Sequence, residues 1–160
     1  MRRRRLRAVS IRLSDDEAWA VIEKSHTGIV TTLRADGSPI ALPIWFVALD
    51  RTIYLRTPQK AKKVARVRRD PRASFLVESG DRWADLCAVH LGGRLELVDD
   101  ETTMGAIQRA LDDKYAAFRT DRSAMPDATR EHYAQWCFLR FVPEGRALTW
   151  DNSCIALKQG

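Results

Sequence analysis

Three short apolar runs separated by tight-turn signals lie between residues 27 and 56, and this succession limits the possible fold more than any other feature of the chain. The runs cover residues 27–33, 39–47 and 53–56. Asp36-Gly37 is a strong hairpin signal between the first two runs, and residues 49–52 turn the chain into the third. Three consecutive strands in hairpin connection predict an antiparallel sheet.

Helix signals lie on both sides of these strands. Ser14 and Glu17 have the spacing of a capping box, which predicts a helix from about residue 15 to residue 24. Thr57 as an N-cap and Pro58 at the first helical position predict a second helix, which ends at Asp70-Pro71. Further strands are expected at residues 73–78, 86–98, 137–142 and 146–150, and further helices at residues 100–118 and 128–133. The pattern predicts an α+β barrel or sandwich of six or seven strands.

The length of 160 residues and the hydrophobic fraction of 45% fit one globular domain. We expect a basic, disordered tail over residues 1–13, the domain over residues 14–155 and a C-terminal tail over residues 156–160. No apolar run approaches the roughly 20 residues of a membrane-spanning helix, and no apolar segment follows the first arginines as in a secretory signal. The three cysteines form no Cys-x-x-Cys pair, so we expect reduced thiols and a cytoplasmic protein.

The formal net charge of +6 is concentrated in two places. Five arginines stand among the first seven residues, so the rest of the chain is nearly neutral. Within that rest, eight basic residues between Arg56 and Arg72 are accompanied by one acid, Asp70. A basic island in a slightly acidic body favours a confined anion site over a surface that coats nucleic acid.

The start of the second predicted helix is the candidate phosphate site. Lys60, Lys62 and Lys63 lie in its first two turns, where positive charge opposes the helix dipole. A phosphate bound by the free N–H groups and the Thr57 hydroxyl would relieve that conflict, with Arg56 as an outer neighbour. The alternative is a solvated basic helix face.

Aromatic and histidine side chains give weaker signals. Trp45 and Phe46 end a strand antiparallel to the one that carries Arg56, and they could flank a planar ring or pack in the core, which is the favoured interpretation. Trp150 could likewise flank a planar ring or pack in the core. The three histidines lack metal-ligand spacing, so we expect no metal site and leave the catalytic residues unassigned. Hydrolase, P-loop and Rossmann glycine motifs are missing from the sequence.

Taken together, these short motifs resemble the pyridoxamine 5′-phosphate oxidase-like superfamily over residues 14–151. The matching segments are residues 37–39, 43–46, 53–57, 68–71, 76–78, 89–94 and 148–151, together with Lys63. The similarity is greatest to an actinobacterial subgroup usually described as dependent on the deazaflavin coenzyme F420. It implies a split β-barrel of six or seven mainly antiparallel strands with flanking helices, which forms a homodimer and binds a flavin or deazaflavin at the subunit interface.

The resemblance also implies roles for individual residues. Thr57, Lys62 and Lys63 fall where the family motif contacts the cofactor phosphate. The segment Pro43, Ile44, Trp45 and Phe46 falls on the strand that runs alongside the cofactor ring. The sequence departs from the FMN-type pattern, because Pro58 and Ala61 stand where Asn and Ser are common. The resemblance therefore leaves both coenzyme F420 and FMN as the expected cofactor.

Three classes of function follow from these patterns. In the first, the protein is an oxidoreductase that transfers a hydride between the bound cofactor and a small organic substrate, and the cofactor carries the chemistry. In the second, a non-catalytic split barrel binds a flavin or haem for storage or sensing. In the third, which we do not expect, the arginine tail and the basic helix bind nucleic acid.

Overall fold

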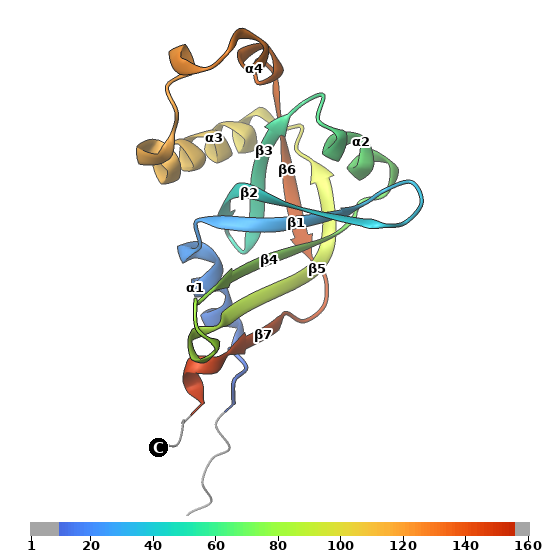
Figure 1. Cartoon of the computed structure of the whole chain (residues 1–160). Helices are drawn as coiled ribbons and strands as arrows, with labels where there is room; N and C mark the ends of the chain where they lie inside the picture. Colours follow the sequence, from blue (N-terminus) through green and yellow to red (C-terminus); the bar gives the residue numbers. More distant parts are fainter. Residues whose placement is uncertain (1–9, 156–160) are drawn as a thin grey trace, which may run out of the picture.

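The computed structural model describes residues 10–155, which form seven strands and four α-helices joined by short loops and 3-10 turns (Figure 1). The helices are α1 (Asp15–Lys24), α2 (Lys62–Arg69), α3 (Glu101–Tyr115) and α4 (Asp127–His132). The strands are β1 (Thr27–Leu33), β2 (Pro39–Leu49), β3 (Thr52–Pro58), β4 (Arg72–Ser79), β5 (Cys87–Leu97), β6 (Trp136–Pro143) and β7 (Leu148–Asp151). None of the helices in this described part is long and apolar enough to span a membrane.

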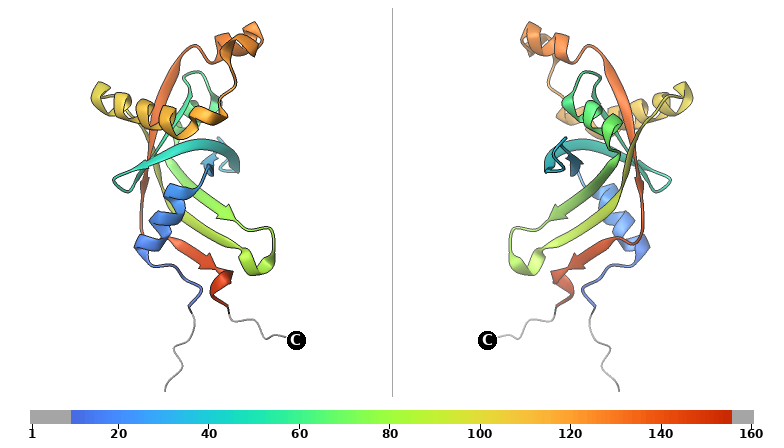
Figure 2. Two further views of the ribbon diagram at one scale, coloured as in Figure 1. Left: turned by 90° about the vertical axis from the view of Figure 1, so that its left-hand side faces the viewer. Right: turned by 90° about the vertical axis from the view of Figure 1, so that its right-hand side faces the viewer.

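All strand pairs are antiparallel, in the order β4-β1-β2-β3-β6-β5-β7. An additional pairing between β4 and β5 closes six of the strands into a barrel, and β7 extends the sheet beyond β5. This confirms the predicted α+β split barrel. α3 and α4 lie at one end of the molecule and β7 at the other (Figure 2).

Strand β2 is shared between two neighbours, which opens the barrel locally. Residues 39–45 pair with β1, whereas residues 46–49 pair with β3. The last residues of β3, Arg56 to Pro58, therefore pair with β6 on one side and have no pairing with β2 on the other. This split separates the exposed half of β2 from the end of β3.

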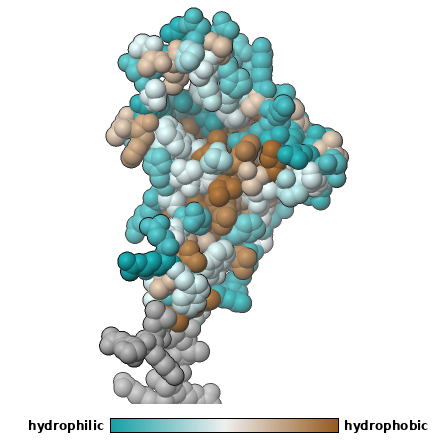
Figure 3. Space-filling model, in the orientation of Figure 1, coloured by the Kyte–Doolittle hydropathy of each residue, from teal (hydrophilic) through white to brown (hydrophobic). Residues whose placement is uncertain are grey.

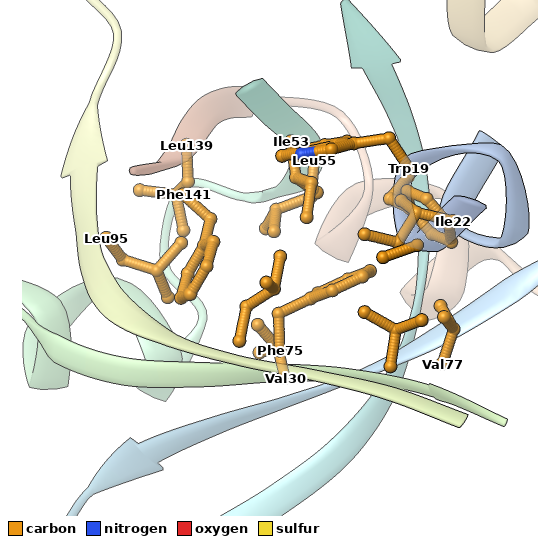
Figure 4. Close-up of a cluster of buried hydrophobic side chains, with 14 of the residues drawn as sticks. Trp19, Ile22, Val30, Ile53, Leu55, Phe75, Val77, Leu95, Leu139 and Phe141 are labelled. Atoms are coloured by element: carbon orange, nitrogen blue, oxygen red, sulfur yellow. The ribbon is translucent and has the colours of Figure 1, made fainter. Parts of the chain in front are cut away.

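Two apolar clusters hold the elements together because strand side chains alternate between the two faces of the sheet. The larger cluster fills the barrel and receives Trp19 and Ile22 from α1, which packs there against Phe75 and the strand residues around it (Figure 4). The smaller cluster lies outside the barrel, where Ile107, Leu111 and Tyr115 of α3 cover Val47 and Phe138. α3 is thereby fixed across the outer face of β2 and β3.

The predicted start of the second helix is wrong. The strand β3 continues through Pro58, with Thr57 opposite Cys137 and Pro58 opposite Trp136 on β6. α2 begins only at Lys62, and its N-cap is Ala61, which makes no side-chain capping bond. A Thr-Pro pair suits both a helix start and the end of a strand, since proline lacks the N–H that a further ladder bond needs. Here the pairing with β6 decides between the two.

The chain before α1 is joined to the last strand. The Leu13 N–H donates to the Thr149 hydroxyl at 3.0 Å, and the Asp151 N–H donates to the Ile11 carbonyl at 2.7 Å. Ile11 and Leu13 of the expected tail are thus hydrogen-bonded to β7. The remainder of that tail, residues 1–9, and the C-terminal residues 156–160 lie outside the described residues.

Candidate functional site

Alternation along β3 separates two neighbouring candidate residues. Thr57 faces the same side as Ile53 and Leu55, which belong to the cluster inside the barrel, and only 3% of Thr57 is exposed. Arg56 faces outward, where its Nη1 donates to the Gln108 side chain of α3 at 2.9 Å. Because they point to opposite faces, Arg56 and Thr57 cannot contact the same atom of a ligand, and the candidate residues divide into two groups.

The outward group lines a cavity of about 470 Å³ between the sheet and the segment that follows α3. Its walls are Trp45 of β2, Arg56 of β3, the end of α3, several residues between 118 and 125, Tyr133 at the end of α4, and Trp136 at the start of β6. We call this space the aromatic–arginine cavity, after the rings and the three guanidinium groups (Arg56, Arg119 and Arg122) that surround it.

Tyr115 at the end of α3 fixes one wall of this cavity. Its ring lies parallel to that of Trp45, with centroids 4.3 Å apart. Its hydroxyl accepts a hydrogen bond from the Phe46 N–H at 2.9 Å and lies 2.8 Å from the carbonyl oxygens of His26 and Phe46. Burial raises the pKa of Tyr115 to about 12, so the hydroxyl keeps its proton well into the alkaline range. Tyr115 therefore holds both the ring of Trp45 and the backbone beside it.

Arg56 forms a second wall of the cavity. Its guanidinium lies over the Trp136 ring, 4.2 Å from the centroid. The Gln108 side chain that accepts from Arg56 donates in turn to Asp112 at 2.7 Å, and Asp112 forms an ion pair with Arg119. The pKa of Arg56 is lowered, first by burial and then by the charges of Arg119 and Arg122. One carboxylate therefore offsets only part of the positive charge around the cavity.

A separate group of basic residues lies along α2 and at the adjoining end of β1, and we call its four members the α2 basic cluster: Arg34, Lys63, Arg66 and Arg69. Lys63 is only 7% exposed, and burial, together with the charge of Arg66, lowers its pKa to about 8. Arg66 donates to the hydroxyl of Thr32 at 2.9 Å. Within residues 10–155, Lys63 has neither a hydrogen bond nor an ion pair through its ammonium group. A bound anion would stabilise this charge.

The other candidate residues lie apart from these two groups. Phe46 is fully buried in the barrel cluster, so the core interpretation holds for it, and Ile44 packs against the same cluster. The core interpretation is wrong for Trp45, which is exposed at the cavity because it points to the opposite face of β2. Pro43 is exposed on the half of β2 that does not pair with β3, residues 39–45. Lys60 and Lys62 are both exposed. Trp150 pairs with Ala88 at the end of the barrel where β7 lies, away from α3 and α4 (Figures 1 and 2).

Sequence reasoning missed most of the cavity wall: Tyr115, Arg119, Arg122, Tyr133 and Trp136. A partial signal was available for Tyr115, because Ile107, Leu111 and Tyr115 recur every four residues and share one face of α3. The arginines stand in a segment without periodic pattern, so only the folded structure brings them to the cavity.

Comparison with known proteins gives consistent results. The family model described as "Pyridoxamine 5'-phosphate oxidase" matches residues 14–146. The crystal structure of a conserved hypothetical protein, Rv2991, from Mycobacterium tuberculosis is 26% identical, covers 97% of each chain and has a TM-score of 0.77.

Two structures of lower identity share the fold. An FAD-binding protein (mll6688) from Mesorhizobium loti is 20% identical, with a TM-score of 0.66 over 84% of this chain and 93% of that chain. A structure described as an F420 reductase is 22% identical, with a TM-score of 0.60 over 79% of this chain and 92% of that chain.

Proposed function

The chain belongs to the pyridoxamine 5′-phosphate oxidase family, and from that membership we propose that it is a flavin- or deazaflavin-dependent oxidoreductase acting on a small organic substrate. The names of two structural relatives, an FAD-binding protein and an F420 reductase, support a cofactor of this type. We propose coenzyme F420 or FMN as the cofactor. When bound, such a cofactor supplies the ring that accepts or donates the hydride, and the protein binds and orients it.

The burial of Lys63 is the observation that carries this proposal. Lys63 is 7% exposed, has no carboxylate partner among the described residues, and has a pKa that burial lowers to about 8, so an anion bound nearby would stabilise its charged form. Both candidate cofactors carry a phosphate group. We propose that Lys63 and Arg66 hold that phosphate with help from the buried Thr57, while the exposed Lys60 and Lys62 contribute at most to long-range attraction.

The split beside β2 supports a position for the cofactor ring. Residues 43–45 belong to the half of β2 that does not pair with β3, and Trp45 at its end borders the aromatic–arginine cavity. We propose that the ring lies along this half of β2, where backbone groups orient it. The neighbouring cavity then gives a substrate access to the ring.

We also propose that the protein is a homodimer. On the half of β2 that pairs with β1 and not with β3, Ala41, Leu42 and Pro43 are exposed, and 39% of the Leu42 surface is accessible. Figure 3 shows an apolar patch on the front of the molecule, over the region where β1 and β2 lie side by side in Figure 1. Large apolar patches of this kind are typical of interfaces, and a two-fold contact would cover the same patch on both copies.

A titration of the purified, cofactor-free protein with coenzyme F420 and with FMN tests this function. We expect saturable micromolar or tighter binding of at least one of them, followed by turnover of the reduced cofactor with an organic acceptor. Binding without any turnover would instead support the second candidate function, a storage or sensing protein. If neither cofactor binds, the proposal is wrong.

A further inference from the structure

The aromatic–arginine cavity is a space separate from the α2 basic cluster. Its volume of about 470 Å³ lies within the range of roughly 300–1,000 Å³ that is usual for small-molecule sites. Arg56 faces it from the outer side of β3, whereas Thr57 faces the inside of the barrel. None of the four residues of the α2 basic cluster lines this cavity, so a ligand in it and a phosphate at Lys63 would contact different side chains.

Exposed aromatic rings around the cavity favour a flat, apolar ligand. Trp45 is 37% exposed, Tyr133 38% and Phe118 58%, although large aromatic side chains are normally buried. Trp45 is held by its parallel contact with Tyr115, and Tyr133 lies against Trp136 with centroids 5.1 Å apart. A planar ring packed against these rings would remove their apolar surface from water and gain stacking contacts.

The charges around the cavity favour an anionic ligand. Arg56 and Arg119 share the single carboxylate of Asp112, one through Gln108 and the other directly. The guanidinium of Arg122 makes no hydrogen bond or ion pair with another residue in the described part of the chain, and only its backbone carbonyl is bonded, to the Met125 N–H. Its guanidinium is therefore available to an incoming acid, and a planar guanidinium suits a carboxylate because it can donate two parallel hydrogen bonds.

We infer that the aromatic–arginine cavity binds the substrate, and that this substrate is a planar aromatic acid. The aromatic walls bind the ring, and Arg122, with Arg56 and Arg119 behind it, binds the acidic group. The identification of this ligand as a substrate rests on the proposed oxidoreductase function. The preference of the cavity for an aromatic acid does not rest on that function, because it follows from the side chains that line the cavity.

Calorimetric titration of the cofactor-free protein with three probes tests the inference. The probes are 2-naphthoate, its uncharged analogue 2-naphthamide, and cyclohexanecarboxylate, which keeps the charge and lacks the aromatic ring. We expect 2-naphthoate to bind at least about tenfold more tightly than either of the others. Equal affinity for 2-naphthoate and 2-naphthamide, or no binding of 2-naphthoate at millimolar concentration, would overturn the inference.

Two arginine variants locate the site. Arg122→Gln should weaken 2-naphthoate binding by about ten- to a hundredfold, as expected for loss of one charge-assisted interaction. Arg82→Gln is the matched control, because Arg82 is an exposed arginine of the β4–β5 connection and not part of the cavity wall. Unchanged affinity in Arg122→Gln would overturn the assignment. Since no cofactor is present, failure of this experiment leaves the cofactor proposal intact, and failed cofactor titrations leave the cavity's ligand preference intact.

Discussion

Trp45 and Tyr115 lie in parallel contact, with ring centroids 4.3 Å apart and planes inclined by 1°. The two residues come from β2 and from the end of α3, and the Tyr115 hydroxyl is hydrogen-bonded to the backbone of Phe46, the residue next to Trp45. The Tyr115 side chain therefore joins α3 to β2 by two contacts, one through its ring and one through its hydroxyl. This contact positions the free half of β2 relative to the aromatic–arginine cavity.

Removing the Tyr115 hydroxyl should destabilise the protein. Tyr115→Phe keeps the ring contact with Trp45 but leaves the buried Phe46 N–H without its partner, which costs about 1–3 kcal/mol. Urea denaturation should show this loss in the free energy of unfolding. Tyr133→Phe is the control, since Tyr133 is partly exposed and the structure gives its hydroxyl no partner among residues 10–155, and it should change stability little. Equal effects of the two changes would contradict this role of Tyr115.

The burial of Lys63 predicts a pH dependence of stability in the cofactor-free protein. Its pKa is about 8 in the folded state, below the ordinary value of about 10.4. Between these values the unfolded chain holds a proton that the folded chain has released, so the free energy of unfolding should rise with pH across this window. Below pH 8 both states are protonated, and the folded state bears the full cost of the buried charge. Lys114 contributes in the same direction, because burial lowers its pKa to about 8 as well.

Lys63→Met isolates this contribution. Urea denaturation at several pH values from 7 to 11 measures how far the free energy of unfolding rises with pH. This rise should be smaller in the variant than in the unmodified protein, by on the order of 1–3 kcal/mol. Lys24→Met, which removes an exposed lysine at the end of α1, should keep the full rise. If Lys63→Met shows the same pH profile as the unmodified protein, Lys63 is not a buried charge.

The apolar surface of β2 predicts a dimer that a charge should disrupt. The unmodified protein should sediment with twice the 18.2 kDa mass of one chain. Leu42→Glu places a charge on the exposed half of β2 and should yield monomers at micromolar concentration. Leu148→Glu on β7 is the control, because Leu148 is 61% exposed outside this patch and should leave the mass unchanged. An 18.2 kDa species for the unmodified protein would contradict the dimer.

The three cysteines should be dispensable for cofactor binding. All three are free thiols, and burial raises the pKa of Cys87 and of Cys137, which keeps both protonated and poorly reactive at neutral pH. Cys137→Ser tests this expectation most strictly, because the Cys137 sulfur lies 3.7 Å from the carbonyl oxygen of Thr57, a proposed cofactor-binding residue. Each serine variant should keep the cofactor affinity of the unmodified protein within about threefold. A folded variant that no longer binds would show that a thiol takes part.

Local signals in the sequence predicted those elements whose ends are set by nearby residues. α1 begins where the capping box of Ser14 and Glu17 predicts, and the first hairpin turns at Gly37, which has a positive φ of 82°. The helix predicted at Pro58 failed because its start depends on β6, whose partner residues lie nearly 80 positions later in the chain. A local pattern cannot decide between a strand end and a helix start when a distant strand makes the difference.

The same limit applies to the site. The basic island between Arg56 and Arg72 was visible in the sequence, and Lys63 lies within it. The sequence could not reveal that Lys62 is exposed while Lys63 is buried, because its local signals predict a helix start four residues before the actual one. Nor could it reveal that Tyr115 reaches Phe46, since that contact depends on how α3 crosses the sheet.

The dissociation constant of the cofactor for Lys63→Ala tests the central claim most directly. Loss of one charge-assisted hydrogen bond should raise the constant for coenzyme F420 or FMN, whichever the unmodified protein binds, by about ten- to a hundredfold. Lys62→Ala removes the neighbouring, exposed lysine and should leave the constant within about threefold of the unmodified value. If both variants bind the cofactor as tightly as the unmodified protein, the α2 basic cluster does not hold the phosphate and the account is wrong.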